Sequence, residues 1–507
     1  MSKSEYVPSQ SEAHSSTYSK ERDLETGTLT QRDTDSASII SRDLNLVTWD
    51  GPDDPENPKN WPSNVKWHYT LAVSVFTFIS PVSSAMVAPA LDKLGKDLHM
   101  TSKIEIDLAL SIFVLAYAIG PLVFGPASEV YGRVRLFQFS NLWYLAWNLG
   151  CGFAQTPAEF FVFRFLAGLG GSAPLALGGG AISDVWHAEH RGKAMGIYTL
   201  APILGPVIGP IAGGFIAQYS TWRWVFWSSS ASAVAIQVVG LIWLRESHPA
   251  TLLKWKRNRL AKETGNDQLH TGEKVETLLQ KIRGAMIRPV RMITTQPIIA
   301  VTAVYMGYLF GISYLMVTTF PDVWAGWYGE SEGIAGLNYI SIAIGSFAGL
   351  FLNVLYIDRI YRNLKAKNGN VGCPEFRMPT MFIGSFIFTV GLFWYGWSVQ
   401  GHVHWIMPNI GVVIFAAGTM GCLQGMQMYI VDCYTTYAAS AMSACALLRS
   451  LAGFGFPLFA PYLYSDLGYG WGTSVLAFIS IAIGIPAPII FWKYGAQLRA
   501  MSTYASG

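Results

Sequence analysis

The sequence predicts an all-α polytopic membrane protein in which twelve transmembrane helices form two six-helix halves. Of its 507 residues, 51% are hydrophobic and only 13% are charged, about half the charged fraction of a soluble domain. Twelve apolar runs of membrane-spanning length follow one another, and one long polar stretch, 245–295, divides them six and six. The composition excludes a water-soluble enzyme or a secreted domain. A net charge of +3 provides no basic field for nucleic acid.

The elements follow in order along the chain. Residues 1–66 are rich in Ser, Thr, Asp and Glu and have no apolar core, so we expect a disordered cytosolic tail. The N-terminal six-helix half should occupy 67–244 and the C-terminal half 296–494, with a short cytosolic tail at 495–507. The expected spans are 67–90, 107–128, 136–155, 161–183, 193–217, 223–244, 297–320, 335–357, 379–399, 404–429, 436–462 and 473–494.

The distribution of Lys and Arg predicts the orientation, because positive residues remain on the cytosolic side. With the N-terminus inside, 29 of the 35 Lys and Arg residues fall in inner segments and two within helices. Both termini are therefore expected in the cytosol. Only four fall in outer loops: Lys93, Lys96, Lys103 and Arg223.

The polar stretch 245–295 contains amphipathic, helix-like pieces such as Thr251–Ala261, so we expect a linker that lies on the membrane surface. A weak internal repeat supports two related halves, since Glu129–Arg133 after the second span resembles Asp358–Arg362 after the eighth. Two such halves place a substrate site at the midplane between them.

The motifs of other energy sources are absent. The sequence has no Gly-x-x-x-x-Gly-Lys-Ser/Thr loop for ATP phosphates and no Cys/His spacing typical of a metal site. Gly168–Ala173 imitates a dinucleotide fingerprint but lies inside an apolar helix without a preceding strand. We therefore expect no cofactor, no metal and no catalytic residues. Primary ATP-driven pumping is therefore not expected.

Three motifs resemble those of the major facilitator superfamily. Gly125–Arg133 is similar to its loop motif between spans two and three, with Glu129 in place of the usual Asp. Arg164 with Gly168–Gly170 resembles its fourth-helix motif, and Gly205–Gly214 is similar to the antiporter motif of its proton-coupled drug exporters. The resemblance implies the twelve-span fold, a small-molecule substrate exchanged for protons, and a monomer in the lipid bilayer.

Two further stretches resemble the fungal twelve-span drug:proton antiporters. They are Trp49–Trp61, and Tyr429–Tyr434 with the residues that lead to Arg449. This family implies a plasma-membrane location. Its substrates include antifungal drugs, polyamines and self-made toxins.

The loop motif supplies a candidate latch between the two halves. Glu129 and Arg133 lie four residues apart at a cytosolic helix end, where they can pair with each other or with Arg191. Gly132 permits the left-handed exit that the short turn requires. The alternative is an ordinary cytosolic anchor beside a solvated acid. The latch candidates are Gly125, Glu129, Gly132, Arg133, Asp358 and Arg362.

The glycines of the fifth span recur every four residues, which places them on one helix face where another backbone can approach closely. The prolines each remove a helix hydrogen bond and bend the span. Spacing alone fits ordinary small-residue packing, and only the family resemblance favours a part in setting which side opens. The motif residues are Gly205, Pro206, Gly209, Pro210, Gly213 and Gly214.

Four charged residues are candidates for proton coupling: Arg164, Asp184, Asp432 and Arg449. An intramembrane cation is costly and is therefore usually paired or directed into a cavity. Arg164 could instead snorkel to the surface, and the two acids could be helix caps or loop acids. No carboxylate lies unambiguously at mid-membrane, so proton coupling is implied chiefly by the resemblance.

Spans seven and ten offer polar-tipped side chains for an otherwise aromatic and apolar cavity, which suits amphipathic organic molecules. The alternative for any aromatic residue is a lipid-facing position. The substrate-binding candidates are Tyr305, Tyr308, Tyr314, Gln424 and Gln427.

The sequence thus favours a proton-coupled exporter of small amphipathic organic compounds that works by alternating access. Two alternatives remain open: an uptake symporter of the same fold, and a non-transporting receptor on this fold. Arg245–Pro249, where sugar-uptake relatives tend to carry a different signature, does not separate them.

Overall fold

The computed structural model describes residues 43, 45–272 and 277–502, without the side chains of Ala188, Asp358 and Thr436. The chain divides into two units, Met1–Leu46 and Val47–Gly507, and the helices all belong to the second unit. Most of the predicted disordered tail, 1–42, lies outside the described residues.

The N-terminal half is a bundle in which α1 packs on α6, α3 on α5, and α4 on α5 and α7. Polar caps fix two of its helix starts: the Ser102 hydroxyl accepts from the Ile104 amide before α3, and the Thr156 hydroxyl accepts from the Glu159 amide before α5. Its helices are α1 (Ser63–Met86), α2 (Leu91–Asp97), α3 (Lys103–Tyr131), α4 (Arg133–Phe153), α5 (Pro157–Val185), α6 (Ala188–Tyr219) and α7 (Arg223–Trp243), with the short turns η1 (Pro58–Asn60) and η2 (Ala88–Ala90).

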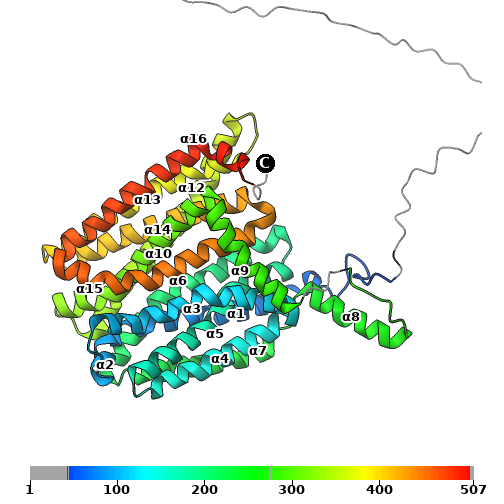
Figure 1. Ribbon diagram of the computed structural model, residues 1–507, viewed down its shortest axis with the longest axis horizontal. Coiled ribbons are helices and arrows are strands. Elements are labelled where there is room, and N and C mark those ends of the chain that lie inside the picture. The colour runs from blue at the N-terminus through cyan, green and yellow to red at the C-terminus, as the bar shows by residue number, and fades with distance from the viewer. Residues whose placement is uncertain (1–42, 44, 273–276, 503–507) are drawn as a thin grey trace, which may run out of the picture. The chain divides into compact units, whose positions relative to one another are not determined.

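The C-terminal half repeats this plan, with α13 packed on α14 and α15, and α10 packed on α15. Figure 1 shows the N-terminal half in blue to blue-green beside the C-terminal half in green to red. The elements are α10 (Pro297–Pro321), η3 (Asp322–Trp327), α11 (Glu332–Leu337), α12 (Ile340–Lys367), η4 (Pro374–Arg377), α13 (Met378–Gln400), α14 (Ile406–Cys433), η5 (Thr435–Tyr437), α15 (Ala438–Gly484) and α16 (Pro486–Ala500).

Ten helices of the described residues are long and apolar enough to cross a membrane. One of them runs for 63 residues, Ala438–Ala500, which is about three times the length of one span and enough for two passes through a bilayer. It breaks at Gly468, whose φ of 69° is not helical, so it accounts for the two last predicted spans. The predicted third span corresponds to α4, whose 21 residues are less apolar. The architecture is consistent with twelve spans.

The predicted tail extends too far into the chain. Residues from Val47 to Trp61 are folded, and α1 already begins at Ser63. The buried carboxylate of Asp54 accepts hydrogen bonds from the Asp50 and Glu56 amides and from Lys256 in the linker. The polar composition of this segment is typical of a disordered tail. Its order depends instead on Lys256, about 200 residues away, and composition does not reveal such a distant partner.

The linker contains two helices, α8 (Pro249–Thr264) and α9 (Leu278–Thr295). The first carries the amphipathic piece Thr251–Ala261 and extends away from the bundle (Figure 1). The second packs against α3 of the N-terminal half and α15 of the C-terminal half. We call the end of the bundle near α8 the predicted cytosolic end, and the opposite end, near α2, the predicted outer end.

Candidate functional site

The glycines of α6 form a ridge that α1 contacts along its backbone. A Cβ on Gly205 would lie 2.5 Å from the Pro81 Cβ, and one on Gly209 would lie 2.5 Å from the Val82 carbonyl oxygen. One on Gly213 would overlap the Met86 carbonyl oxygen. The predicted close approach of a second backbone is therefore confirmed. The part of Pro206 and Pro210, which lie inside α6, in setting which side opens stays a prediction.

The same helix reaches the other half at the predicted outer end. A Cβ on Gly214 would lie 2.5 Å from the Glu332 carbonyl oxygen in α11, and the Gln218 side chain accepts a 2.9 Å hydrogen bond from the Gly333 amide. The sixth motif position thus contacts the C-terminal half, whereas Gly205, Gly209 and Gly213 contact α1.

Two ion pairs also join the halves at this end. Lys93 in α2 lies 2.8 Å from Glu332, and Lys103 at the start of α3 lies 3.0 Å from Asp322. We call this set the outer gate: Lys93, Lys103, Asp322 and Glu332. Within the described part of the chain, no ion pair joins the two halves at the predicted cytosolic end. These two ion pairs hold the halves together at the predicted outer end.

Arg164 is fully buried in the N-terminal half and does not snorkel. Its guanidinium donates to the backbone carbonyls of Ser83, at 2.7 Å, and Ser84, at 3.2 Å. Both carbonyls belong to the last turn of α1, which ends at Met86 and leaves its final four carbonyls without intrahelical partners. Arg164 is therefore the C-terminal cap of α1, where its positive charge also faces the negative end of the helix dipole.

A buried polar network extends from this cap. The Ser83 hydroxyl donates to the Asn148 side chain in α4, and the Asn148 amide nitrogen donates to Ser229 and Ser230 in α7. The network fixes α1, α4, α5 and α7 to one another. The sequence analysis missed Asn148, because a single Asn in an apolar run carries no motif.

Arg449 is the second intramembrane cation, and it lies in α15 with its guanidinium 5.0 Å from the Phe310 ring centroid. Its Nε is buried without a hydrogen-bond partner. Neither Arg449 nor Arg164 pairs with a carboxylate of the described residues. Their assignment to proton coupling stays a prediction.

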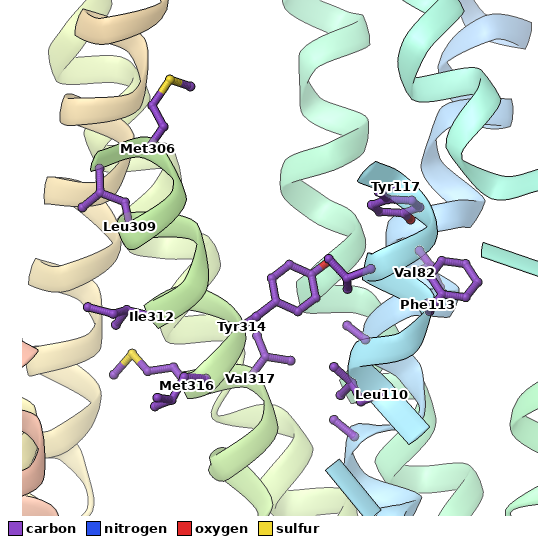
Figure 2. Packing of buried hydrophobic residues seen from close by; sticks show 14 of the residues in the cluster. Val82, Leu110, Phe113, Tyr117, Met306, Leu309, Ile312, Tyr314, Met316 and Val317 are labelled. Carbon is purple, nitrogen blue, oxygen red and sulfur yellow. The ribbon is translucent and has the colours of Figure 1, made fainter. Parts of the chain in front are cut away.

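Among the substrate candidates, Tyr314 lies between the two halves. Its hydroxyl lies 3.2 Å from the Ser84 hydroxyl of α1. Figure 2 shows it pointing from α10 toward Val82, while Leu309 and Ile312 point to the other side. The Phe310 ring packs against it at a tilt of 46°, with the ring centroids 4.9 Å apart. The interface is thus aromatic with polar tips.

The other candidates lie elsewhere. The Tyr305 hydroxyl donates to Ser385 inside the C-terminal half, and the Tyr308 hydroxyl donates to the Leu476 carbonyl. Gln424 and Gln427 are half-buried in α14. An apolar groove of about 550 Å³ lies between α10 and α15, lined by Ala303, Val304, Gly307, Tyr308, Leu448, Leu451, Ala452, Gly455, Phe456, Phe459 and Ile483. The structure does not bring all five candidates together.

The latch prediction needs three corrections, beginning with Arg133. This residue pairs with Asp184 at 3.1 Å, not with Glu129. Gly132, with φ of 93°, turns the chain so that Arg133 begins α4 beside the end of α5. Asp184 is therefore the partner of the loop motif. Gly125, the first motif glycine, has no described heavy atom within 4 Å of a Cβ placed on it.

The second correction concerns the repeat. Arg377 pairs with Asp432 at 3.1 Å, through the same Nε and Oδ2 atoms as Arg133 and Asp184. It lies directly before the first residue of α13, and Arg133 is the first residue of α4. Arg362 lies inside α12, which continues to Lys367. Arg377 is thus the counterpart of Arg133. The side chain of Asp358 lies outside the described residues.

The third correction concerns Glu129, which pairs with Lys281 of the linker helix α9 at 3.2 Å. Glu246, which the sequence analysis did not select, contacts the start of α4 instead. Its buried carboxylate accepts from the backbone amides of Arg133 and Val134 and caps α4. Burial and the charge of Arg133 lower the pKa of the adjacent His248.

Comparison with known proteins assigns the architecture. The family model described as Major Facilitator Superfamily matches residues 73–457. The chain belongs to the major facilitator superfamily. It is 67% identical over 500 residues to the efflux pump vrtL of Penicillium aethiopicum, covering 98% of this chain and 99% of that one. It is 40% identical to the efflux pump radE of Floropilus chiversii, covering 90% and 86% of the two chains.

Solved structures of this superfamily share the fold. The partially occluded inward-open xylose transporter XylE from E. coli has a TM-score of 0.63 at 15% identity, covering 85% of this chain and 98% of that one. Membership in this transporter superfamily and ten candidate membrane helices in the described residues establish a multi-pass membrane protein of transporter type. The fungal relatives agree with the family that Trp49–Trp61 resembles.

Proposed function

We propose that this chain is a proton-coupled exporter of small amphipathic organic compounds that works by alternating access. The observation that carries the proposal is the position of α6, whose motif glycines contact α1 in one half and α11 at the predicted outer end. A helix so placed can set which side of the protein opens. Two relatives of the chain are named as efflux pumps, which supports transport out of the cell.

The interface between the halves fits the proposed substrate class. Tyr314, Phe310 and Arg449 provide an aromatic surface with a phenol and a guanidinium, and the groove beside Tyr308 is apolar. Amphipathic organic molecules match a mainly apolar site with few polar groups. We assign Tyr314 first among the substrate candidates, and Tyr305 to internal support of the C-terminal half.

Asp184 and Asp432 were candidates for proton coupling, but their ion pairs fit a role as latch residues better. Asp184 and Asp432 each pair with an arginine of their own half at the predicted cytosolic end. We propose that Arg133–Asp184 and Arg377–Asp432 hold the two cytosolic helix ends in matching positions. Proton coupling then involves Arg164 or Arg449 together with a carboxylate that approaches in another conformation. We further propose a monomer in the plasma membrane with both termini in the cytosol.

The test measures retention of labelled amphipathic compounds in pump-depleted fungal cells that express the chain, with and without a protonophore. We expect lower retention, which the protonophore abolishes. The control is a Gly209→Leu variant with equal surface delivery, which should retain the compounds as empty cells do. Higher, protonophore-sensitive retention would establish an uptake symporter instead. Unchanged retention across a broad panel would favour the receptor and contradict the proposal.

A further inference from the structure

The linker helix α9 has two faces of different character. One face packs into the bundle, where Met292 is 1% exposed and Leu278 and Ile293 contact the hydrophobic core. The neighbouring face is apolar but exposed, and Leu279 at one end is 76% exposed. Its members recur at helical spacing: Leu279, Met286, Ile287 and Val290.

Basic residues accompany this exposed apolar face. The sequence of α9 contains four Lys or Arg residues and no Asp or Glu. Lys281 pairs with Glu129. Arg283, Arg288 and Arg291 are exposed, and the ion pairs found among the described residues include none of the three. An exposed apolar face beside unpaired arginines is the pattern of a helix at the surface of an anionic bilayer.

The position of α9 supports the same partner. Only Gln296 separates its last residue, Thr295, from α10, a helix long and apolar enough to span the membrane. Its bundle-facing side lies on α3 and α15, so its other side faces outward where α10 enters the bilayer (Figure 1). The first linker helix differs: Lys256 of α8 is buried against Asp50 and Asp54 of the Val47–Trp61 segment.

We propose that α9 is a lipid-binding helix, in which Arg283, Arg288 and Arg291 bind anionic phospholipid headgroups of the cytosolic leaflet. Leu279, Met286, Ile287 and Val290 insert among the acyl chains beneath them. Because α9 packs on α3 of the N-terminal half and on α15 and α10 of the C-terminal half, the bound lipid holds the linker across the seam between α3 and α15. The membrane-surface part of the linker is thus α9, not Thr251–Ala261.

The test uses the full chain in nanodiscs of phosphatidylcholine, with or without phosphatidylserine. Cys373→Ser removes the least buried of the five free cysteines, and Thr294→Cys, at an exposed position of α9, carries an environment-sensitive fluorophore. Lipids with a quencher near the headgroup should quench it, and phosphatidylserine should increase the quenching. Each arginine contributes about fivefold to partitioning onto an anionic surface. The variant R283Q/R288Q/R291Q should therefore lose the increase.

The matched control removes the same charge from α8, with K254Q/R257Q/K262Q. The fluorophore on this control should be quenched as strongly as the fluorophore on the parent. Equal melting temperatures will show that the variants are folded. The double variant L279E/I287E should lose quenching in both lipids. Equal quenching of the parent with and without phosphatidylserine, or equal effects of the α8 and α9 triple variants, would overturn the proposal. So would an unquenched, blue-shifted label, because it indicates a protein partner over α9.

Discussion

Gly209→Ala tests whether the close packing of the α6 glycines against α1 is required for stability and export. The new Cβ would lie 2.5 Å from the Val82 carbonyl oxygen and 3.1 Å from the Met86 amide nitrogen, whereas ordinary contact begins at 3.4 Å. Both neighbours are backbone atoms, so α1 and α6 must separate by about 1 Å at this level. Overpacking of this kind costs about 1–3 kcal/mol. Because α1 also carries the carbonyls that Arg164 caps, the separation should disturb that cap.

Gly196→Ala on the same helix is the matched control, since no described heavy atom lies within 4 Å of a Cβ placed there. Both substitutions gain about 1 kcal/mol of helix propensity, so their difference isolates the overpacking of Gly209. Thermal unfolding of the two purified variants measures the stability difference, and protonophore-sensitive export measures function. We expect lower stability and slower export for Gly209→Ala alone. Equal melting temperatures and equal export would refute the argument.

Three further predictions follow from single contacts. Arg164→Gln should destabilise the protein by about 3 kcal/mol, because two buried carbonyls of α1 lose a charged donor, and thermal unfolding should show a loss that Arg164→Lys only partly restores. Lys103→Gln should raise the population with an open outer end by up to about fivefold, since a half-exposed ion pair contributes about 0.2–1 kcal/mol. Labelling of an Ala325→Cys variant by a membrane-impermeant maleimide measures this, and Asp322→Asn should act in the same direction. For Asp54, burial alone would raise the pKa, but the amide hydrogen bonds and Lys256 lower it below 3.8. The folded segment Val47–Trp61 should therefore keep this stabilisation above about pH 4 and lose it as the pH falls through the lowered value, which hydrogen exchange of its amides will show.

The spans were predictable because each depends on a local property, an apolar run long enough to cross the bilayer. The order of Val47–Trp61 was not predictable, because Asp54 pairs with Lys256 from a distant part of the chain. The same reason explains the error in the repeat. Arg362 resembles Arg133 in its local sequence, whereas Arg377 occupies the matching place in the fold.

The candidate site was predictable in part. The spacing of Gly205, Gly209 and Gly213 predicted a close backbone approach, because it is a property of one helix. The partners of Arg164 could not be found, since backbone carbonyls carry no sequence signal and only the end of α1 leaves them free. Glu246 was missed for the same reason, because its partners are the amides of Arg133 and Val134.

The distribution of polar contacts determines where the molecule can move. Three buried contacts stay within one half: Arg164 with Ser83, Asn148 with Ser229, and Tyr305 with Ser385. The buried hydroxyl contact of Tyr314 with Ser84 crosses between the halves. Contacts between the halves at the outer gate are partly exposed ion pairs, each worth about 0.2–1 kcal/mol. Binding of a substrate or a proton can offset energies of this size, but not the loss of the buried network. Each half should therefore move as a rigid body, and opening of the outer end should separate Lys103 from Asp322 while Arg164 stays on α1.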